Sequence, residues 1–153
     1  MLRLLLVDEE IPNDDWDDST GSETPYMWYY AEAAKTDEDL KVTVVRSYLD
    51  ARKLLDVSQI EFDVVSLDVS MPFPGGEGSE KAKSGLLTGL VLLDLIIERK
   101  NSVPVILLSN IPRPLLMKEL PSHENYFNLT VFEKVETDPF LFVELVKELG
   151  RIG

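Results

Sequence analysis

Short apolar runs alternate with segments of helical or loop character along the whole chain. Five runs, at residues 2–7, 41–46, 62–67, 103–108 and 129–132, have the length and composition of β-strands. Residues 2–7 are apolar almost throughout, as expected of a strand that is covered on both faces. Residues 41–46 alternate and are β-branched, which is typical of an edge strand. The pattern therefore predicts five strands, most of them buried.

Helical patterns fill much of the chain between these runs, at residues 25–35, 49–55, 86–98, 114–120 and 139–149. Thr24-Pro25 and Asp138-Pro139 are typical of a helix cap followed by the first helical residue. Residues 10–23 are acid-rich and residues 73–84 contain several glycines and prolines, so both segments are expected to be loops. Strands and helices that alternate in this way, joined by right-handed crossovers, predict a doubly wound α/β fold of the (βα)5 type with a parallel five-stranded sheet.

Polar residues of distinct chemistry stand at the ends of four runs. They are Asp8 and Glu9, then Asp68, then Ser109 and Asn110, and finally Lys134. Because the carboxyl ends of parallel strands meet at one edge of a sheet, these groups are expected to converge. Two carboxylates about 4 Å apart repel by roughly 4 kcal/mol at an effective dielectric constant near 20, so the cluster should raise a pKa or recruit a cation. The set suits a divalent metal ion and a phosphoryl group.

Composition narrows the class of protein. The chain has 153 residues, a length that favours one domain, and no cysteine. Its formal net charge of −13, from 28 acidic and 15 basic residues, repels nucleic-acid backbones, so direct DNA or RNA binding is not expected. The N-terminus lacks the pattern of a signal peptide, and the longest apolar stretch, residues 85–97, falls short of a membrane span. A cytoplasmic location without membrane contact is the resulting expectation.

Five features occur in order along the chain, each on its expected element. They are Val7-Asp8-Glu9, Asp68-Val69-Ser70-Met71-Pro72, Gly89-Leu90, Ser109-Asn110 and Lys134. Over essentially its whole length the chain resembles the receiver domain of two-component response regulators. The resemblance implies a flavodoxin-like sheet with strand order 2-1-3-4-5, formed by residues 1–153 as a single domain with no output domain.

The resemblance also implies roles for the matching acidic residues. Asp68 would be the carboxylate that accepts a phosphoryl group from a sensor histidine kinase or a histidine phosphotransfer protein. Asp8, Glu9 and Asp68 would hold Mg²⁺, together with the backbone carbonyl of Ser70. Mg²⁺ would be the cofactor of the phosphoryl transfer.

Two further residues complete the implied site. Ser109 would donate its hydroxyl to a phosphoryl oxygen, and Lys134 would pair with the acyl phosphate. Such a stand-alone receiver signals to a downstream protein target, by conformational switching or by phosphorelay. It is not an enzyme beyond its own self-catalysed phosphorylation and dephosphorylation.

Four departures from the family pattern lie beside the expected site: Val135 in place of the usual proline, Val131 in place of the switch aromatic with Phe132 one position off, Asn110 in place of a small residue, and loop insertions at about 10–23 and 73–84. They leave open an alternative, a pseudo-receiver that acts without phosphorylation as a protein–protein interaction module. A phosphatase with an aspartyl nucleophile is a third alternative. Such enzymes usually carry a second acid two residues beyond the nucleophile, where this chain has Ser70.

Overall fold

The chain folds around one parallel β-sheet. The computed structural model describes residues 1–13, 16, 25–56, 62–75, 79–83, 85–99, 102–120, 128–134 and 138–152. The five strands are β1 (Leu2–Val7), β2 (Leu40–Val45), β3 (Val64–Asp68), β4 (Val105–Ser109) and β5 (Leu129–Glu133). They pair in parallel in the order β2-β1-β3-β4-β5. The predicted fold class and strand order are therefore confirmed.

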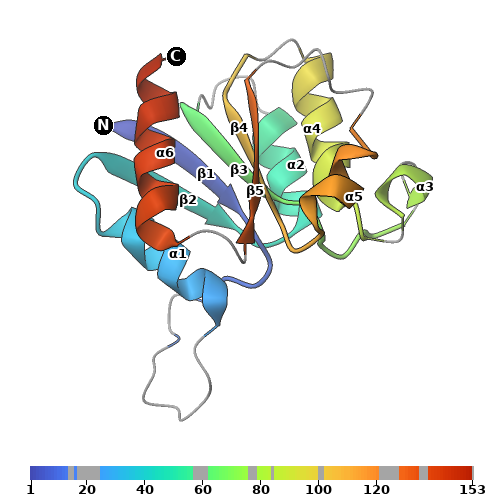
Figure 1. The fold of residues 1–153 in the computed structure, drawn as a ribbon, viewed down its shortest axis with the longest axis horizontal. Helices are drawn as coiled ribbons and strands as arrows, with labels where there is room; N and C mark the ends of the chain where they lie inside the picture. The colour runs from blue at the N-terminus through green and yellow to red at the C-terminus, as the bar shows by residue number, and fades with distance from the viewer. Residues whose placement is uncertain are drawn as a thin grey trace.

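Helices cover both faces of the sheet. They are α1 (Tyr26–Lys35), α2 (Tyr48–Asp56), α3 (Ser79–Ala82), α4 (Thr88–Glu98), α5 (Arg113–Met117) and α6 (Pro139–Ile152). Figure 1 shows α1 and α6 on one face and α2, α4 and α5 on the other. The four-residue α3 lies within the glycine-rich segment that was expected to be a loop throughout. Most of the acidic segment, at residues 14–15 and 17–23, and residues 76–78 and 84 of the second predicted insertion lie outside the described residues.

Each strand contributes to two cores because its side chains alternate between the faces of the sheet. Leu4 and Leu6 of β1 join a core with residues of α1 and α6. Leu5 and Val7 join the opposite core, beneath α2, α4 and α5. All residues of β3 and β4 are buried, in agreement with apolar runs that are covered on both sides.

Helix starts differ from the sequence expectation in instructive ways. Pro25 has φ −59° and ψ 139° and is the residue before α1, not its first turn, and Thr24 lies outside the described residues. Asp138 behaves as predicted, because its Oδ1 accepts the backbone N–H of Leu141 at 2.9 Å. Helix α4 begins at Thr88, two residues late, because Leu87 is held in a turn by a 2.7 Å hydrogen bond from its N–H to the Ala82 carbonyl.

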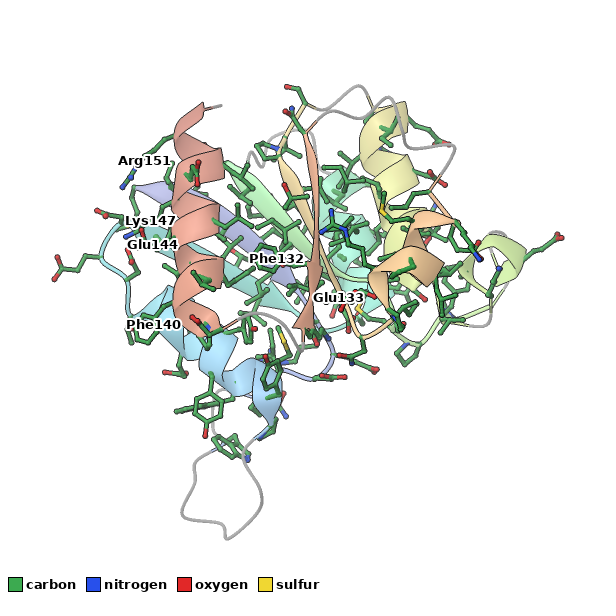
Figure 2. The ribbon with its side chains drawn as sticks, viewed as in Figure 1. Phe132, Glu133, Phe140, Glu144, Lys147 and Arg151 are labelled. Atoms are coloured by element: carbon green, nitrogen blue, oxygen red, sulfur yellow. The ribbon has the colours of Figure 1, made fainter. Side chains whose placement is uncertain are left out.

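Helix α6 is fastened to the turn that joins α1 to β2. The Lys147 ammonium lies 3.1 Å from the Asp37 carboxylate and 3.4 Å from the Glu144 carboxylate, and Figure 2 shows Glu144, Lys147 and Arg151 along the outer side of this helix. Phe140, at its base, is 80% exposed. Among the described residues, no helix has the length and apolarity needed to cross a membrane.

Candidate functional site

Strand pairing brings the polar ends of the strands to one edge of the sheet. Val7 of β1 pairs with Leu67 of β3, so Asp8 and Asp68 leave adjacent strands at the same level. Asp68 pairs in turn with Leu108 of β4, which places Ser109 one residue further along. The parallel register therefore produces the predicted convergence without any long side-chain reach.

The Lys134 ammonium stands at the centre of this edge. Its Nζ lies 3.1 Å from Asp8 Oδ2, 3.3 Å from Asp68 Oδ1 and 3.6 Å from Glu10 Oε2. Asp8 is 0% exposed, Asp68 2% and Lys134 1%, so the ion pairs are shielded from solvent. One buried cation thus holds two buried carboxylates and one partly exposed carboxylate. We call these four residues the acidic cluster.

Local turns orient the two buried carboxylates. Asp8 Oδ1 accepts the backbone N–H of Glu10 at 2.9 Å, and Asp68 Oδ1 accepts that of Ser70 at 3.3 Å. Each is a bond from an aspartate to the backbone two residues on, which aspartate favours at the start of a turn. Asp68 Oδ2, in contrast, is buried and has no hydrogen-bond partner among the residues that the structure describes. Such an atom is costly unless a ligand or a proton completes it.

Burial and charge shift the titration of the cluster. Burial raises the pKa of Asp68 to about 7, with a further rise from the charge of Asp8 and an opposing effect of Lys134. Burial also raises the pKa of Asp8, again opposed by Lys134. For Lys134, burial acts to lower the pKa, but the three carboxylate neighbours outweigh it and the pKa is raised. Three carboxylates around one ammonium favour uptake of a proton or a cation.

The other predicted site residues lie nearby with different environments. Glu9 is exposed, and its pKa is raised by partial burial and by the charges of Asp8 and Glu10. The Ser109 hydroxyl is buried and accepts the backbone N–H of Ile111 at 2.8 Å. The structure therefore brings Asp8, Asp68 and Lys134 into contact, and leaves Glu9 facing solvent and Ser109 bonded within its own turn.

Glycine allows helix α4 to touch the end of β3. A Cβ atom at Gly89 would lie 2.5 Å from the Asp68 carbonyl oxygen and 2.8 Å from the Val69 Cα. The Gly89 N–H donates to the Val69 carbonyl at 2.8 Å, and the neighbouring Thr88 hydroxyl donates to the Met71 carbonyl at 2.5 Å. The N-terminus of α4 and the turn after Asp68 are thus one packed unit.

Two residues of the site were missed from the sequence. Glu10 belongs to the acid-rich segment expected to be a loop, but it joins the Lys134 ion pairs, and the only signal for this is its place two residues after Asp8. Tyr26 donates its hydroxyl to the backbone carbonyl of Lys134 and lies 3.0 Å from the Tyr30 hydroxyl. No local pattern links Tyr26 with a residue 108 positions away.

The aromatic residue near Lys134 faces away from α5. Val131 packs against the core beneath α2, α4 and α5, whereas Phe132 packs against the core of α1 and α6. Figure 2 shows Phe132 beside the sheet and Glu133 at the tip of β5. The carboxylate of Glu133 accepts the backbone N–H of Arg113, the first residue of α5. A one-residue shift in a strand moves a side chain to the other face of the sheet. The aromatic ring of Phe132 therefore does not occupy the face on which Val131 lies.

The chemistry of the acidic cluster fits Mg²⁺, which takes oxygen ligands and usually binds through one or two carboxylates with water and phosphate oxygens. The unpartnered Asp68 Oδ2 and the excess of carboxylates over ammonium groups both suit such an ion. Within the described ranges, no group of three or more acidic, histidine or cysteine side chains surrounds a common metal position. Glu9 would have to turn inward to make a third ligand.

Comparisons with known proteins locate the fold. No family model matches the sequence, and no curated protein matches it. The chain is similar in structure to the receiver domain of the Francisella response regulator 1452, with 17% identity and a TM-score of 0.63 over 99% of this chain and 98% of that one. It is also similar to a response regulator receiver protein from Sinorhizobium medicae WSM419, with 17% identity and a TM-score of 0.65 over 98% of this chain and 94% of that one. The chain has the receiver fold.

The same fold extends to a CheY-like receiver protein from Methanospirillum hungatei JF-1, at 13% identity and a TM-score of 0.62 over 100% of this chain and 99% of that one. The acidic cluster of this chain lies at the carboxyl edge of the sheet, where open α/β folds place their ligands. The resemblance inferred from the sequence is thereby confirmed for the fold.

Proposed function

We propose that this chain is a receiver that accepts a phosphoryl group on Asp68 and signals to a downstream protein. One observation carries the proposal. The Asp68 carboxylate ends β3 with the Lys134 ammonium 3.3 Å from its Oδ1, and Asp8 lies on the same ammonium at 3.1 Å. A carboxylate nucleophile with a fixed cation beside it is what phosphoryl transfer needs, because that reaction depends on positioning and charge neutralisation.

The donor in this proposal is a phosphohistidine of a sensor kinase or a histidine phosphotransfer protein. An oxygen of ionised Asp68 attacks the phosphorus, the P–N bond breaks, and its electron pair stays on the imidazole nitrogen, which takes up a proton. The product is an acyl phosphate on Asp68 and a neutral histidine. Lys134 would remain beside the new phosphoryl oxygens and offset their charge.

Mg²⁺, when bound, would supply further positive charge where the transferring oxygens lie. Asp8, Asp68 and the backbone carbonyl of Ser70 would hold it, with Glu9 turning in from the rim. The Ser109 hydroxyl would exchange its present bond to Ile111 for a phosphoryl oxygen. A switch of this kind from 1:99 to 99:1 needs about 5.5 kcal/mol of differential stabilisation.

Acetyl phosphate with Mg²⁺, followed by intact mass measurement, tests the proposal. We expect the wild type to gain one phosphoryl group in a form that hydroxylamine removes, as expected of an acyl phosphate. Asp68→Asn should abolish the gain, and Asp50→Asn, at an exposed position on α2, should leave it intact. A mass gain that survives Asp68→Asn would contradict the assignment.

A second candidate is a receiver that works without phosphorylation, as a protein–protein interaction module. The observation in its favour is burial, since Asp68 is 2% exposed and the Lys134 side chain that contacts it is itself buried. Mg²⁺ titration separates the two candidates. Binding that competes with protonation of the acidic cluster supports the phosphoacceptor, whereas no binding at millimolar Mg²⁺ and no mass gain support the interaction module.

A further inference from the structure

A second concave site lies outside the acidic cluster, between α1 and the segment that follows β1. It is a pocket of about 170 Å³ lined by Ile11, Pro12, Asn13, Trp16, Trp28, Ala31, Glu32 and Lys35. Cavities of roughly 150 Å³ take up a benzene-sized molecule. The pocket therefore has room for one aromatic ring with a short polar tail.

The walls of the pocket come from α1 and from residues that follow β1. Trp28, Ala31, Glu32 and Lys35 stand on one face of α1, at the spacing of successive helical turns. Opposite them, the Arg46 guanidinium donates to the Ile11 carbonyl at 2.9 Å and to the Pro12 carbonyl at 2.8 Å.

The backbone N–H of Trp16 donates a hydrogen bond to the Asn13 carbonyl at 2.9 Å. Together with the Arg46 hydrogen bonds to Ile11 and Pro12, this bond ties Trp16 to the backbone that faces α1. Hydrogen bonds that already hold lining residues in place lower the ordering cost of binding.

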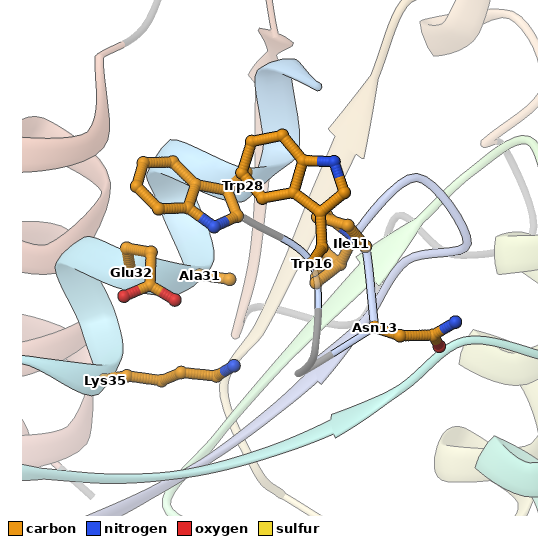
Figure 3. A pocket seen from close by; sticks show the side chains of 8 residues that line it. Ile11, Asn13, Trp16, Trp28, Ala31, Glu32 and Lys35 are labelled. Atoms are coloured by element: carbon orange, nitrogen blue, oxygen red, sulfur yellow. The ribbon is translucent and has the colours of Figure 1, made fainter. Parts of the chain in front are cut away.

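The lining combines aromatic surface with charges of both signs. The indoles of Trp16 and Trp28 lie with centroids 5.4 Å apart at 57°. Figure 3 shows the two indoles along one side of the pocket, Lys35 along the opposite side, and Glu32 between Trp28 and Lys35 on α1. Small-molecule sites typically join apolar walls to a few polar groups of this kind.

We propose that this pocket binds a small zwitterion with an aromatic ring, of the chemical class of the aromatic α-amino acids. The ring packs against the two indoles. Its ammonium group is recognised by Glu32, and its carboxylate by Lys35. The proposal does not depend on phosphoryl transfer, because no residue of the acidic cluster lines the pocket.

The two tryptophans make the test direct. They are the only tryptophans in the 153 residues, and both line the pocket, so indole fluorescence reports on this site alone. Three probes share one ring: L-phenylalanine, phenethylamine, which lacks the carboxylate, and hydrocinnamate, which lacks the ammonium group. We expect a saturable change with L-phenylalanine, with a Kd on the order of 1 mM or below. Each analogue should bind about tenfold more weakly, because it loses one charge-assisted contact.

Charge-neutral substitutions assign the contacts. Glu32→Gln should weaken binding of L-phenylalanine and phenethylamine about tenfold, and Lys35→Gln should weaken binding of L-phenylalanine and hydrocinnamate about tenfold. Glu38→Gln and Lys41→Gln, at exposed positions outside the pocket, are the matched controls and should bind as the wild type does. Circular dichroism confirms that each variant is folded.

Ligand-observed saturation-transfer NMR repeats the measurement without relying on fluorescence. The proposal is overturned if no probe binds saturably, if L-phenylalanine binds no more tightly than both analogues, or if either pocket variant keeps wild-type affinity for it. Asp68→Asn should bind L-phenylalanine normally. A chain that binds the amino acid but is not phosphorylated would therefore contradict the proposed function and leave this inference standing.

Discussion

The hydroxyl of Tyr26 in α1 donates a hydrogen bond to the backbone carbonyl of Lys134, directly after β5. The same hydroxyl lies 3.0 Å from the hydroxyl of Tyr30, whose ring packs edge-on against Phe142 of α6. The backbone that carries the central ammonium of the acidic cluster is therefore fixed by the helical layer on one face of the sheet. Lys134 is positioned from two directions, by its carboxylate partners and by α1.

Loss of the Tyr26 hydroxyl should loosen this attachment. Tyr26→Phe keeps the ring and removes the donor, and we expect the free energy of unfolding to fall by about 0.5–1 kcal/mol. The lower part of the usual range is appropriate because Tyr26 is 45% exposed. Urea denaturation measures the effect. Tyr29→Phe, at a neighbouring tyrosine that is 48% exposed, is the control and should change the free energy by much less.

Removal of the central cation should be far more costly. Lys134→Met leaves the buried carboxylates of Asp8 and Asp68 without their counter-ion, which typically costs about 3–5 kcal/mol. Adding Asp8→Asn to this variant should recover part of the loss, because one of the two buried charges disappears.

The measurement is urea denaturation near neutral pH, with Lys53→Met, at an exposed position on α2, as the control. Mg²⁺ should stabilise Lys134→Met more than the wild type, since binding to the folded state raises stability by mass action. Equal unfolding free energies for Lys134→Met and the wild type would show that the ion pairs contribute nothing net.

Stability should decrease as the pH rises through neutrality. The pKa of Asp68 in the folded chain is about 7, above its ordinary value of 3.8. A carboxyl group with a raised pKa favours the folded state while it is protonated there, and this contribution is lost as the pH rises through the folded-state pKa. The raised pKa of Asp8 acts in the same direction. We expect the free energy of unfolding in chelator-treated buffer to be on the order of 2 kcal/mol lower at about pH 8 than at about pH 5.

Asp68→Asn should flatten this dependence and should stabilise the chain at the alkaline end, because the amide carries no charge to bury. Asp50→Asn should leave the slope unchanged, since Asp50 is exposed and does not belong to the acidic cluster. An unfolding free energy that rises with pH over the same interval would contradict the raised pKa.

Gly89 should not tolerate a methyl group. In a helix interior, glycine to alanine normally adds up to about 1 kcal/mol of stability. Here the added Cβ would lie 2.5 Å from the Asp68 carbonyl oxygen, so α4 and the end of β3 must separate. We expect Gly89→Ala to lower the free energy of unfolding by about 2 kcal/mol and to slow phosphorylation of Asp68. Glu98→Ala, at the exposed end of the same helix, should stay within about 0.5 kcal/mol of the wild type.

The sheet was predictable from the sequence because its strands leave a strong local signal. Buried parallel strands are apolar runs of a few residues, and each run in this chain became a strand with ends shifted by at most two residues. Asp8, Asp68 and Lys134 were found because a residue at the end of such a run must reach the carboxyl edge. Parallel register then decides which neighbours meet.

What could not be predicted depends on side-chain geometry across long separations. Nothing in the local pattern near Tyr26 indicates that its hydroxyl reaches Lys134, and Glu10 differs from a solvated acid only through the ammonium opposite it. The short α3 forms in a glycine-rich segment where propensity favours a loop. The Trp16–Trp28 pair joins a residue after β1 to α1, and the nearby Ile11 carbonyl is held by Arg46, a residue from another strand end.

Residues 8–12, directly after β1, are held by two basic side chains. Lys134 forms ion pairs with Asp8 and Glu10, and Arg46 donates hydrogen bonds to the carbonyls of Ile11 and Pro12. In a free loop, neighbouring negative charges would move apart, but the ion pairs and hydrogen bonds restrict the movement of this backbone. Their mutual repulsion is accordingly retained as electrostatic frustration, which any incoming positive charge relieves. Such repulsion would favour a cation at the place where the proposed chemistry would begin.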